Sequence, residues 1–332
     1  MNLENLFTPA ALTKAVNTLP KPSTVLGDAG LFKVKKVKTP YVMIESLNGR
    51  LVLVEDTDRN SDGKQKGNSK RTRKTFQLLH LPRPTTVTAD ELNVQAYGED
   101  GDNLTAAADV VNDKLQGCKD DIEQTIEFHR VGAITGKILD ADGTTIIYNL
   151  YSEFGVQEKN VNISFSTDTT DVRGAINAAK RHAKKQLGGA LVKGWKCYCS
   201  PEYFDALTAH PKVQKAFEGY QAAADRIGGD VSKGFTFAGV EFIEYDVEVL
   251  NNKGQPVKYI AEGKARLVPV VDDLFVTFYG PANYNDASNT LGQEMYASVE
   301  PRQHKKGYDL EAQSNPLSIC TAPGALVQLS AT

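Results

Sequence analysis

A long polar segment separates two stretches of β-strand pattern near the N-terminus. Residues 33–55 and 75–87 are rich in β-branched and other apolar residues, whereas residues 56–74 contain three acidic residues, seven basic residues and otherwise only polar residues or glycine. Such a segment has no side chains to bury, and a structureless loop of this length in a compact domain is usually functional or disordered. We therefore predict an extended hairpin with a basic tip, which needs a surface outside its own core on which to rest.

The overall composition is that of a globular protein. The 332 residues allow about two domains, and 41% hydrophobic with 24% charged residues matches soluble domains. A formal net charge of -3 excludes a strong general attraction to nucleic acid or to anionic membranes. No run approaches the roughly 18 apolar residues of a membrane span, and the N-terminus lacks a signal-peptide pattern, so we expect a cytoplasmic protein without a membrane partner.

Residues 1–32 predict a short helix followed by an extended arm. Thr8 suits the N-cap, Pro9 suits the first helical position, and Leu12 and Val16 mark one face. The prolines that follow disfavour further helix. Because so short a helix is not stable alone, we expect Leu12 and Val16 to dock on another part of the fold or on a neighbouring molecule.

The strongest helix pattern spans about 102–134. Asp102 suits its N-cap, no proline interrupts it, and at 1.5 Å per residue its length is on the order of 45 Å. Apolar residues recur at steps of three or four, which places them on one face. The residues predicted to pack from this face include Leu104, Val111, Leu115, Ile122 and Ile126. The opposite face, with Lys119 and Glu123, is expected to be solvated or to meet partners.

The rest of the chain predicts a mixture of helices and strands, and hence an α+β fold. A β-hairpin is expected to turn at Asp142–Gly143. Helices are expected over 170–187, 200–207 and 211–227. Strands are expected over 195–199, 235–250, 259–271, 274–279 and 316–329.

The sequence contains no recognisable catalytic constellation. The five histidines form no metal-binding motif, and the phosphate-binding loop and nucleophile-elbow motifs do not occur. Cys197 and Cys199 fit alternating positions of a buried strand better than a zinc site. Asp272–Asp273 fits a turn better than an acid–base pair. We expect no catalytic residue, no cofactor and no metal, and hence a structural protein and not an enzyme.

The basic segment leaves two interpretations open. The run from Lys70 to Lys74 attracts phosphates, so the chain is either a DNA-associated protein that uses loop 59–74 as a contact arm, or one whose loop pairs with a neighbouring subunit. Aromatic residues for stacking on single strands are absent from the run. The basic helix segment 180–185 is expected to be a solvated or interface face.

The order of these elements resembles the Hong Kong 97-type fold of tailed-phage major capsid proteins. Within that fold, the sequence is most similar to the lambda-like major capsid protein E family. The matching stretches are 76–92, 231–245 and 305–317. The resemblance implies an N-terminal arm (1–32), an E-loop formed by the extended hairpin (33–86), a P-domain with the spine helix (87–167), an A-domain (168–285) and strands that return to the P-domain (286–332).

The resemblance also implies a function. Copies of the chain are expected to form hexamers and pentamers of an icosahedral shell around double-stranded DNA, assembled in the host cytoplasm and located in the virion capsid. Scaffolding, portal and decoration proteins are the further partners that it implies. The E-loop tip is expected to contact neighbouring subunits through its basic residues, Arg59, Lys64, Lys66, Lys70, Arg71, Arg73 and Lys74.

Overall fold

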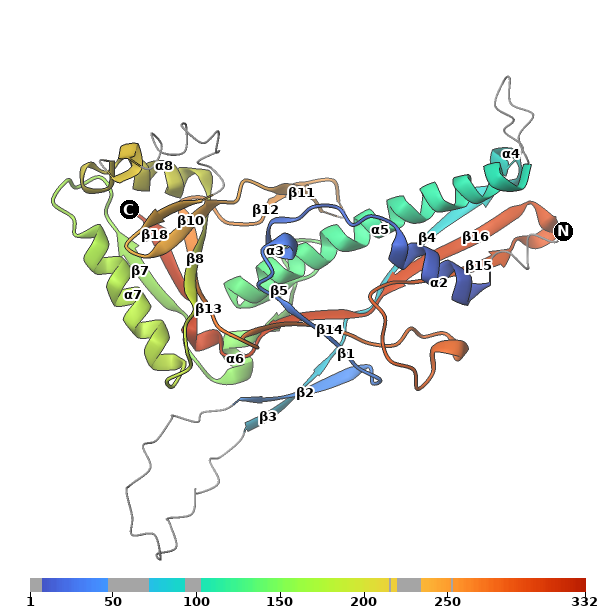
Figure 1. The fold of residues 1–332 in the computed structure, drawn as a ribbon, viewed down its shortest axis with the longest axis horizontal. Coiled ribbons are helices and arrows are strands. Elements are labelled where there is room, and N and C mark those ends of the chain that lie inside the picture. Colours follow the sequence, from blue (N-terminus) through green and yellow to red (C-terminus); the bar gives the residue numbers. More distant parts are fainter. Residues whose placement is uncertain (1–7, 47–71, 93–102, 215, 220–233, 252) are drawn as a thin grey trace, which may run out of the picture. The chain divides into compact units, whose positions relative to one another are not determined.

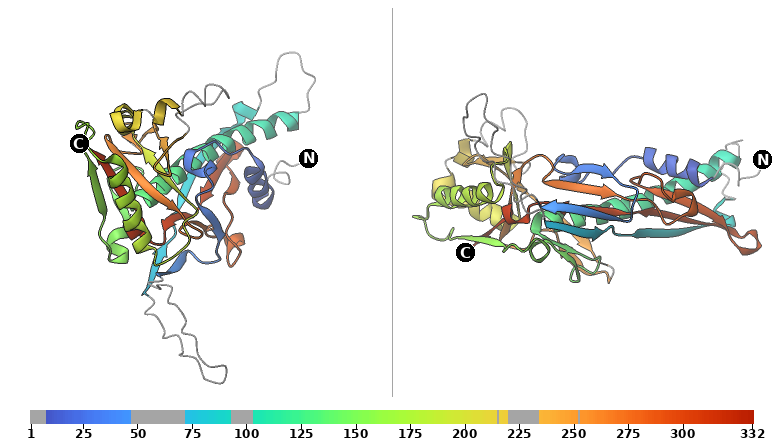
Figure 2. Two further views of the ribbon diagram at one scale, coloured as in Figure 1. Left: turned by 60° about the vertical axis from the view of Figure 1, so that its left-hand side comes forward. Right: turned by 90° about the horizontal axis from the view of Figure 1, so that it is seen from below.

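The computed structural model describes residues 8–46, 72–92, 103–214, 216–219, 234–251 and 253–332 (Figures 1 and 2). The fold is α+β and divides into two compact units, each made of three separate stretches of chain. Unit 1 comprises Met1–Val42, Thr75–His129 and Val276–Ser318. Unit 2 comprises Met43–Lys74, Arg130–Phe275 and Ile319–Thr332.

Unit 1 is built on a three-stranded antiparallel sheet. Its strand order is β15 (Tyr296–Pro301), β16 (Gly307–Ser314) and β4 (Leu81–Thr88). The helices α2 (Pro9–Thr18) and α5 (Asn103–Thr135) share one hydrophobic core with this sheet. The α5 helix corresponds to the helix predicted over 102–134, and its residues from Arg130 onward belong to unit 2.

Smaller elements complete unit 1. The strand β1 (Lys33–Lys36) pairs in parallel with β14 (Phe275–Tyr279), and the order of that sheet is β1-β14-β17, with β17 over Pro316–Cys320. Two one-turn helices, α3 (Val25–Asp28) and α4 (Ala89–Leu92), follow α2 and β4 in the chain.

Unit 2 contains a mixed six-stranded sheet. Its order is β7 (Lys159–Ile163), β18 (Val327–Ala331), β13 (Lys264–Val270), β8 (Gly194–Cys199), β10 (Val240–Glu244) and β9 (Phe235–Phe237). The helices α7 (Val172–Gln186) and α8 (Pro201–Ala209) pack on this sheet in a single core. Cys197 and Cys199 are buried in that core as free thiols, which confirms their predicted place in a strand.

Two hairpins and a short helix are further described elements of unit 2. The β5 (Lys137–Leu139) and β6 (Ile146–Asn149) strands form the predicted hairpin, where Gly143 has φ 73° and the Asp142 carboxylate accepts the amides of Thr144 and Thr145. The α6 helix (Leu150–Phe154) follows it. The second hairpin joins β11 (Glu248–Leu250) to β12 (Pro256–Lys258).

The prediction of one continuous hairpin over 33–86 is wrong. Among the described residues of this segment, β2 (Tyr41–Ser46) and β3 (Thr72–Gln77) pair with each other, whereas β1 pairs with β14 and β4 with β16. Proline lacks the N–H that a strand ladder needs, and Pro40 stands between β1 and β2. Pro82 and Pro84 lie in β4, which is an edge strand and therefore tolerates them.

Two other predicted strands are each divided by a turn. The segment 235–250 turns back at Ala238 and Gly239, whose φ values of 51° and 69° fit a tight hairpin loop between β9 and β10. The segment 316–329 changes sheet through the 3₁₀ turn Pro323–Ala325, so that β17 and β18 lie in different sheets. Residues 319–332 and β7 both belong to unit 2.

We expect Leu115→Ala to lower the free energy of unfolding by about 2–5 kcal/mol, because Leu115 is fully buried in the unit 1 core and its truncation leaves a cavity. Leu291→Ala is the matched control, since Leu291 is 51% exposed. Urea unfolding followed by circular dichroism measures both changes. Equal effects of the two substitutions would contradict this account of the core.

Candidate assembly elements

The N-terminal arm lies on its own subunit. The Thr8 hydroxyl caps α2 by accepting the Ala11 amide at 3.3 Å. On the buried face of α2, Leu12 and Val16 are 3% and 0% exposed and join the core cluster of α5 and the β15–β16–β4 sheet. The same helix is tied to β15, because Thr13 Oγ1 accepts the Ala297 amide at 3.2 Å.

A buried lysine of α5 binds the C-terminal end of α2. Lys119 is 1% exposed, and its Nζ donates to the carbonyl oxygens of Val16 at 2.8 Å and of Leu19 at 2.6 Å. Carbonyls at the end of a helix lack partners within the helix and carry its negative partial charge, which an ammonium group neutralises. Burial lowers the pKa of Lys119, and the nearby Glu123 carboxylate opposes that shift.

A buried glutamate of α5 binds the next turn of the arm. Glu127 is 1% exposed, and its two carboxylate oxygens accept the amides of Leu26 at 2.6 Å and of Gly27 at 3.2 Å. These amides belong to α3, whose N-cap Thr24 makes no side-chain cap bond. The glutamate therefore supplies the negative charge and the acceptors that the start of this helical turn needs.

Lys119, Glu123 and Glu127 follow one another at steps of four residues and so lie along one stripe of α5; we call them the arm clamp. The middle member, Glu123, is 5% exposed, and its Oε1 lies 3.9 Å from the Lys21 ammonium group. Lys21 also pairs with Glu294. The arm is thus held at α2, at Lys21 and at α3 by three charged side chains of one helix.

The expectation that Lys119 and Glu123 lie on a solvated or partner-facing surface is wrong. Both side chains lie beneath the arm, which covers the stripe that carries them. Their charges resemble those of an exposed helix face, so the sequence gives no sign of this burial unless the course of the arm is known. Glu127 was missed for the same reason.

The predicted packing face of α5 points into the core of unit 1. Val111, Leu115, Ile122 and Ile126 are between 0% and 3% exposed and contact residues of β4, β15 and β16 within one cluster. The Leu104 side chain lies outside the described residues.

Most of the predicted E-loop tip lies outside the part of the chain that the structure describes. This holds for Arg59, Lys64, Lys66, Lys70 and Arg71, and also for the side chain of Arg73, whose backbone lies in β3. Lys74 is described, and its Nζ lies 3.7 Å from Glu153 of the same unit. Both side chains are about two-fifths exposed, so this ion pair contributes at most about 1 kcal/mol.

The strand β2 carries apolar side chains on both of its faces. Val42 and Ile44 are each 6% exposed, whereas the alternate residues Tyr41 and Met43 are 50% and 66% exposed. A strand with one solvated face ordinarily places polar residues there. Tyr41 and Met43, which we call the ribbon face, therefore offer apolar surface to a partner.

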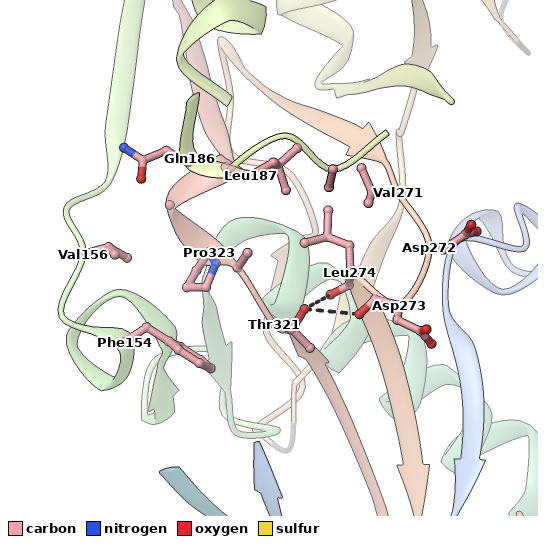
Figure 3. Close-up of a pocket in the computed structure, with 14 residues that line it drawn as sticks. Phe154, Val156, Gln186, Leu187, Val271, Asp272, Asp273, Leu274, Thr321 and Pro323 are labelled. Atoms are coloured by element: carbon pink, nitrogen blue, oxygen red, sulfur yellow. Dashed lines mark hydrogen bonds between the residues drawn. The ribbon is translucent and has the colours of Figure 1, made fainter. Parts of the chain in front are cut away.

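A pocket of about 220 Å³ in unit 2 lies beside the end of α7 and the turn Pro323–Ala325 (Figure 3). Thr321 Oγ1 there donates to the backbone of Asp273 and Leu274, and Asp272 pairs with Lys193 at 2.7 Å. Its lining has no histidine, cysteine or lysine. In the described ranges, no histidine, cysteine or carboxylate cluster suits a metal ion, and no helix is long and apolar enough to cross a membrane.

Comparison with known proteins places this architecture in a family. The family model described as phage major capsid protein E matches residues 8–331. The chain is 25% identical to the major capsid protein of Salmonella phage Felix O1, over 98% of this chain and 96% of that protein. It is 26% identical to the major capsid protein of Pseudomonas phage KPP10, over 98% and 97% of the two chains.

A solved structure shows the same fold. A protein described as a prophage capsid protein from Escherichia coli CFT073 superposes with a TM-score of 0.64 at 14% identity, covering 98% of this chain and 99% of that chain. The chain therefore belongs to the phage major capsid protein E family, and it is a major capsid protein of a phage or prophage with the Hong Kong 97-type fold.

Proposed function

We propose that the chain is a non-enzymatic subunit that forms hexamers and pentamers, and that these close an icosahedral shell around double-stranded DNA. Members of a capsid family self-assemble into shells, which supports the first part of this proposal. The ribbon face also supports association between copies, because Tyr41 and Met43 leave apolar surface exposed in the single subunit. Permanent assemblies bury such surface in large interfaces.

The proposal assigns roles to the arm and the E-loop. The arm, 1–32, docks on the spine helix through Leu12, Val16 and the arm clamp. The E-loop, carried by β2 and β3, contacts the neighbouring subunit through the ribbon face and the basic residues of its tip. Assembly takes place in the host cytoplasm, with scaffolding, portal and decoration proteins as further partners. The rival role of loop 59–74 as a DNA-contact arm is not favoured, because the chain belongs to a family of shell proteins.

We expect the purified protein to form closed shells or capsomers in negative-stain microscopy, with particle masses of many subunits in light scattering. The physical reason is that the ribbon face leaves apolar surface exposed in the single subunit. A protein that stays strictly monomeric at high concentration would refute the proposed function.

We expect the double variant Tyr41→Ser/Met43→Ser to remain folded but to lose shell yield by about tenfold or more at limiting concentration. Covering an apolar side chain contributes up to about 1.5–3 kcal/mol, and each 1.4 kcal/mol is a factor of about ten in an equilibrium. Particle counts by microscopy measure the yield. The matched control is Leu191→Ser/Leu291→Ser, since these leucines are 78% and 51% exposed elsewhere. Equal yields from both variants would contradict the role of the ribbon face.

We expect Lys119→Met to loosen the arm, because it removes two hydrogen bonds from a charged donor while keeping an unbranched apolar stem. Bonds to charged groups contribute about 1.5–3 kcal/mol each, so amide exchange over residues 9–28 should accelerate by at least tenfold. Hydrogen exchange with mass spectrometry measures this rate. Lys114→Met is the control, since Lys114 pairs with Glu91 at 3.0 Å on a half-exposed surface. No difference between the two variants would mean that the clamp does not hold the arm.

A further inference from the structure

The solvent-facing side of α7 is basic. Its buried face packs on the six-stranded sheet through Val172, Ile176, Ala179 and Ala183. Arg181, Lys184 and Lys185 are exposed on the other side, and the helix itself contains no acidic residue. Lys159 is exposed at the start of β7, the edge strand of the sheet. We call these four residues the basic patch.

Nothing in the described part of the chain neutralises the basic patch. No ion pair joins any of its four residues to a described carboxylate. Burial lowers the pKa of His182, and the charges of Lys159 and Lys185 lower it further, which places these two cations close to the same imidazole. The helix dipole accounts for Lys184 and Lys185 in the last turn, but not for Arg181 or Lys159.

A second surface of unit 2 has the opposite charge. Asp246 and Glu248 are exposed where the chain passes from β10 to β11, and no described residue forms an ion pair with either. Lys258 faces Glu248 in the β11–β12 register, but its Nζ binds Glu202 at 3.3 Å and Glu262 at 2.9 Å. Two carboxylates therefore bind Lys258, and Asp246 and Glu248 add two more acidic side chains to the same surface. We call Glu202, Asp246, Glu248 and Glu262 the acidic patch.

The topology of the sheet keeps the two patches apart. The strand β7 lies at one edge, and β10 lies next to the opposite edge. Because β7 is parallel to β18, β18 and β8 are both antiparallel to β13, and β8 is parallel to β10, the strands β7 and β10 run the same way. Lys159 begins β7 and Glu244 ends β10, so the patches lie toward opposite ends of the sheet. Figure 1 shows α7 and the β11–β12 hairpin on different sides of it.

We infer that the basic patch of one copy binds the acidic patch of the next copy in a head-to-tail contact between neighbouring unit 2 surfaces. This inference rests on the proposed function, which brings identical copies side by side. Contacts between two different surfaces of the same subunit generate rings when the rotation closes. Complementary charge steers the encounter and disfavours wrong orientations. A second copy fits better than DNA, because the chain itself carries the complementary charge and a net charge of -3.

Charge reversal with rescue tests the contact. Arg181→Glu/Lys184→Glu and Asp246→Lys/Glu248→Lys should each lower shell or capsomer yield at least tenfold, because like charges then face each other. The quadruple variant should recover most of the wild-type yield, since both charges are reversed together. Circular dichroism and thermal unfolding of each variant check that the subunit is folded. Lys14→Glu/Lys306→Glu, at two exposed lysines of unit 1, matches the first variant in net charge and should assemble as the wild type does.

Other outcomes overturn the inference. Double variants that assemble normally would show that the patches do not meet, and so would a quadruple variant no better than either double. If the Arg181→Glu/Lys184→Glu shells form normally but retain less DNA, the basic patch faces nucleic acid and not a second copy. Failure of the wild-type protein to form particles would refute the proposed function as well, whereas wild-type particles with unaffected variants would refute only this pairing.

Discussion

The buried stripe of charge on α5 is the interaction on which the arrangement of unit 1 depends. A buried ion costs several kcal/mol unless hydrogen bonds and opposite charges surround it. Lys119 donates to two carbonyls and Glu127 accepts two amides of the arm, so these four hydrogen bonds exist only while the arm is in place. The hydrogen bonds of the clamp are directional and therefore specify one position for the arm. Burial of Leu12 and Val16 stabilises the docked arm, but hydrophobic packing is not directional.

The division of the chain between two units affects the order in which the subunit can fold. Each unit is assembled from three stretches of sequence, so neither contains a continuous half of the chain. The late strands β15 and β16 complete the unit 1 sheet beside β4, and β18 inserts between β7 and β13 in unit 2. Neither sheet is complete until the C-terminal part of the chain has been added, which favours folding of the whole subunit before its surfaces are offered to other copies.

A subunit that assembles needs surfaces that tolerate exposure to water in the free subunit and that bind a neighbouring copy in one orientation. In our proposal, the ribbon face supplies the binding area, and the basic and acidic patches supply the selectivity. Tyr41 and Met43 offer apolar area, which binds without discrimination, while charges on α7 and near β11 add orientation. Cys197 and Cys199 are packed as apolar side chains in β8, as the sequence predicted.

The sequence by itself determined the helices and turns that depend on residues close together in the chain. The period of α5, the Thr8–Pro9 start of α2 and the Asp142–Gly143 turn are each set by near neighbours in the chain, and the order of elements sufficed for the family. Only the tertiary structure decided strand partners and the burial of charge. Pairing of β1 with β14 or β4 with β16 joins residues more than two hundred positions apart, and the same lysine suits either solvent or a covered helix end. Lys119 is buried because the arm brings the carbonyls of Val16 and Leu19 to its ammonium group, and the course of the arm is a property of the tertiary structure.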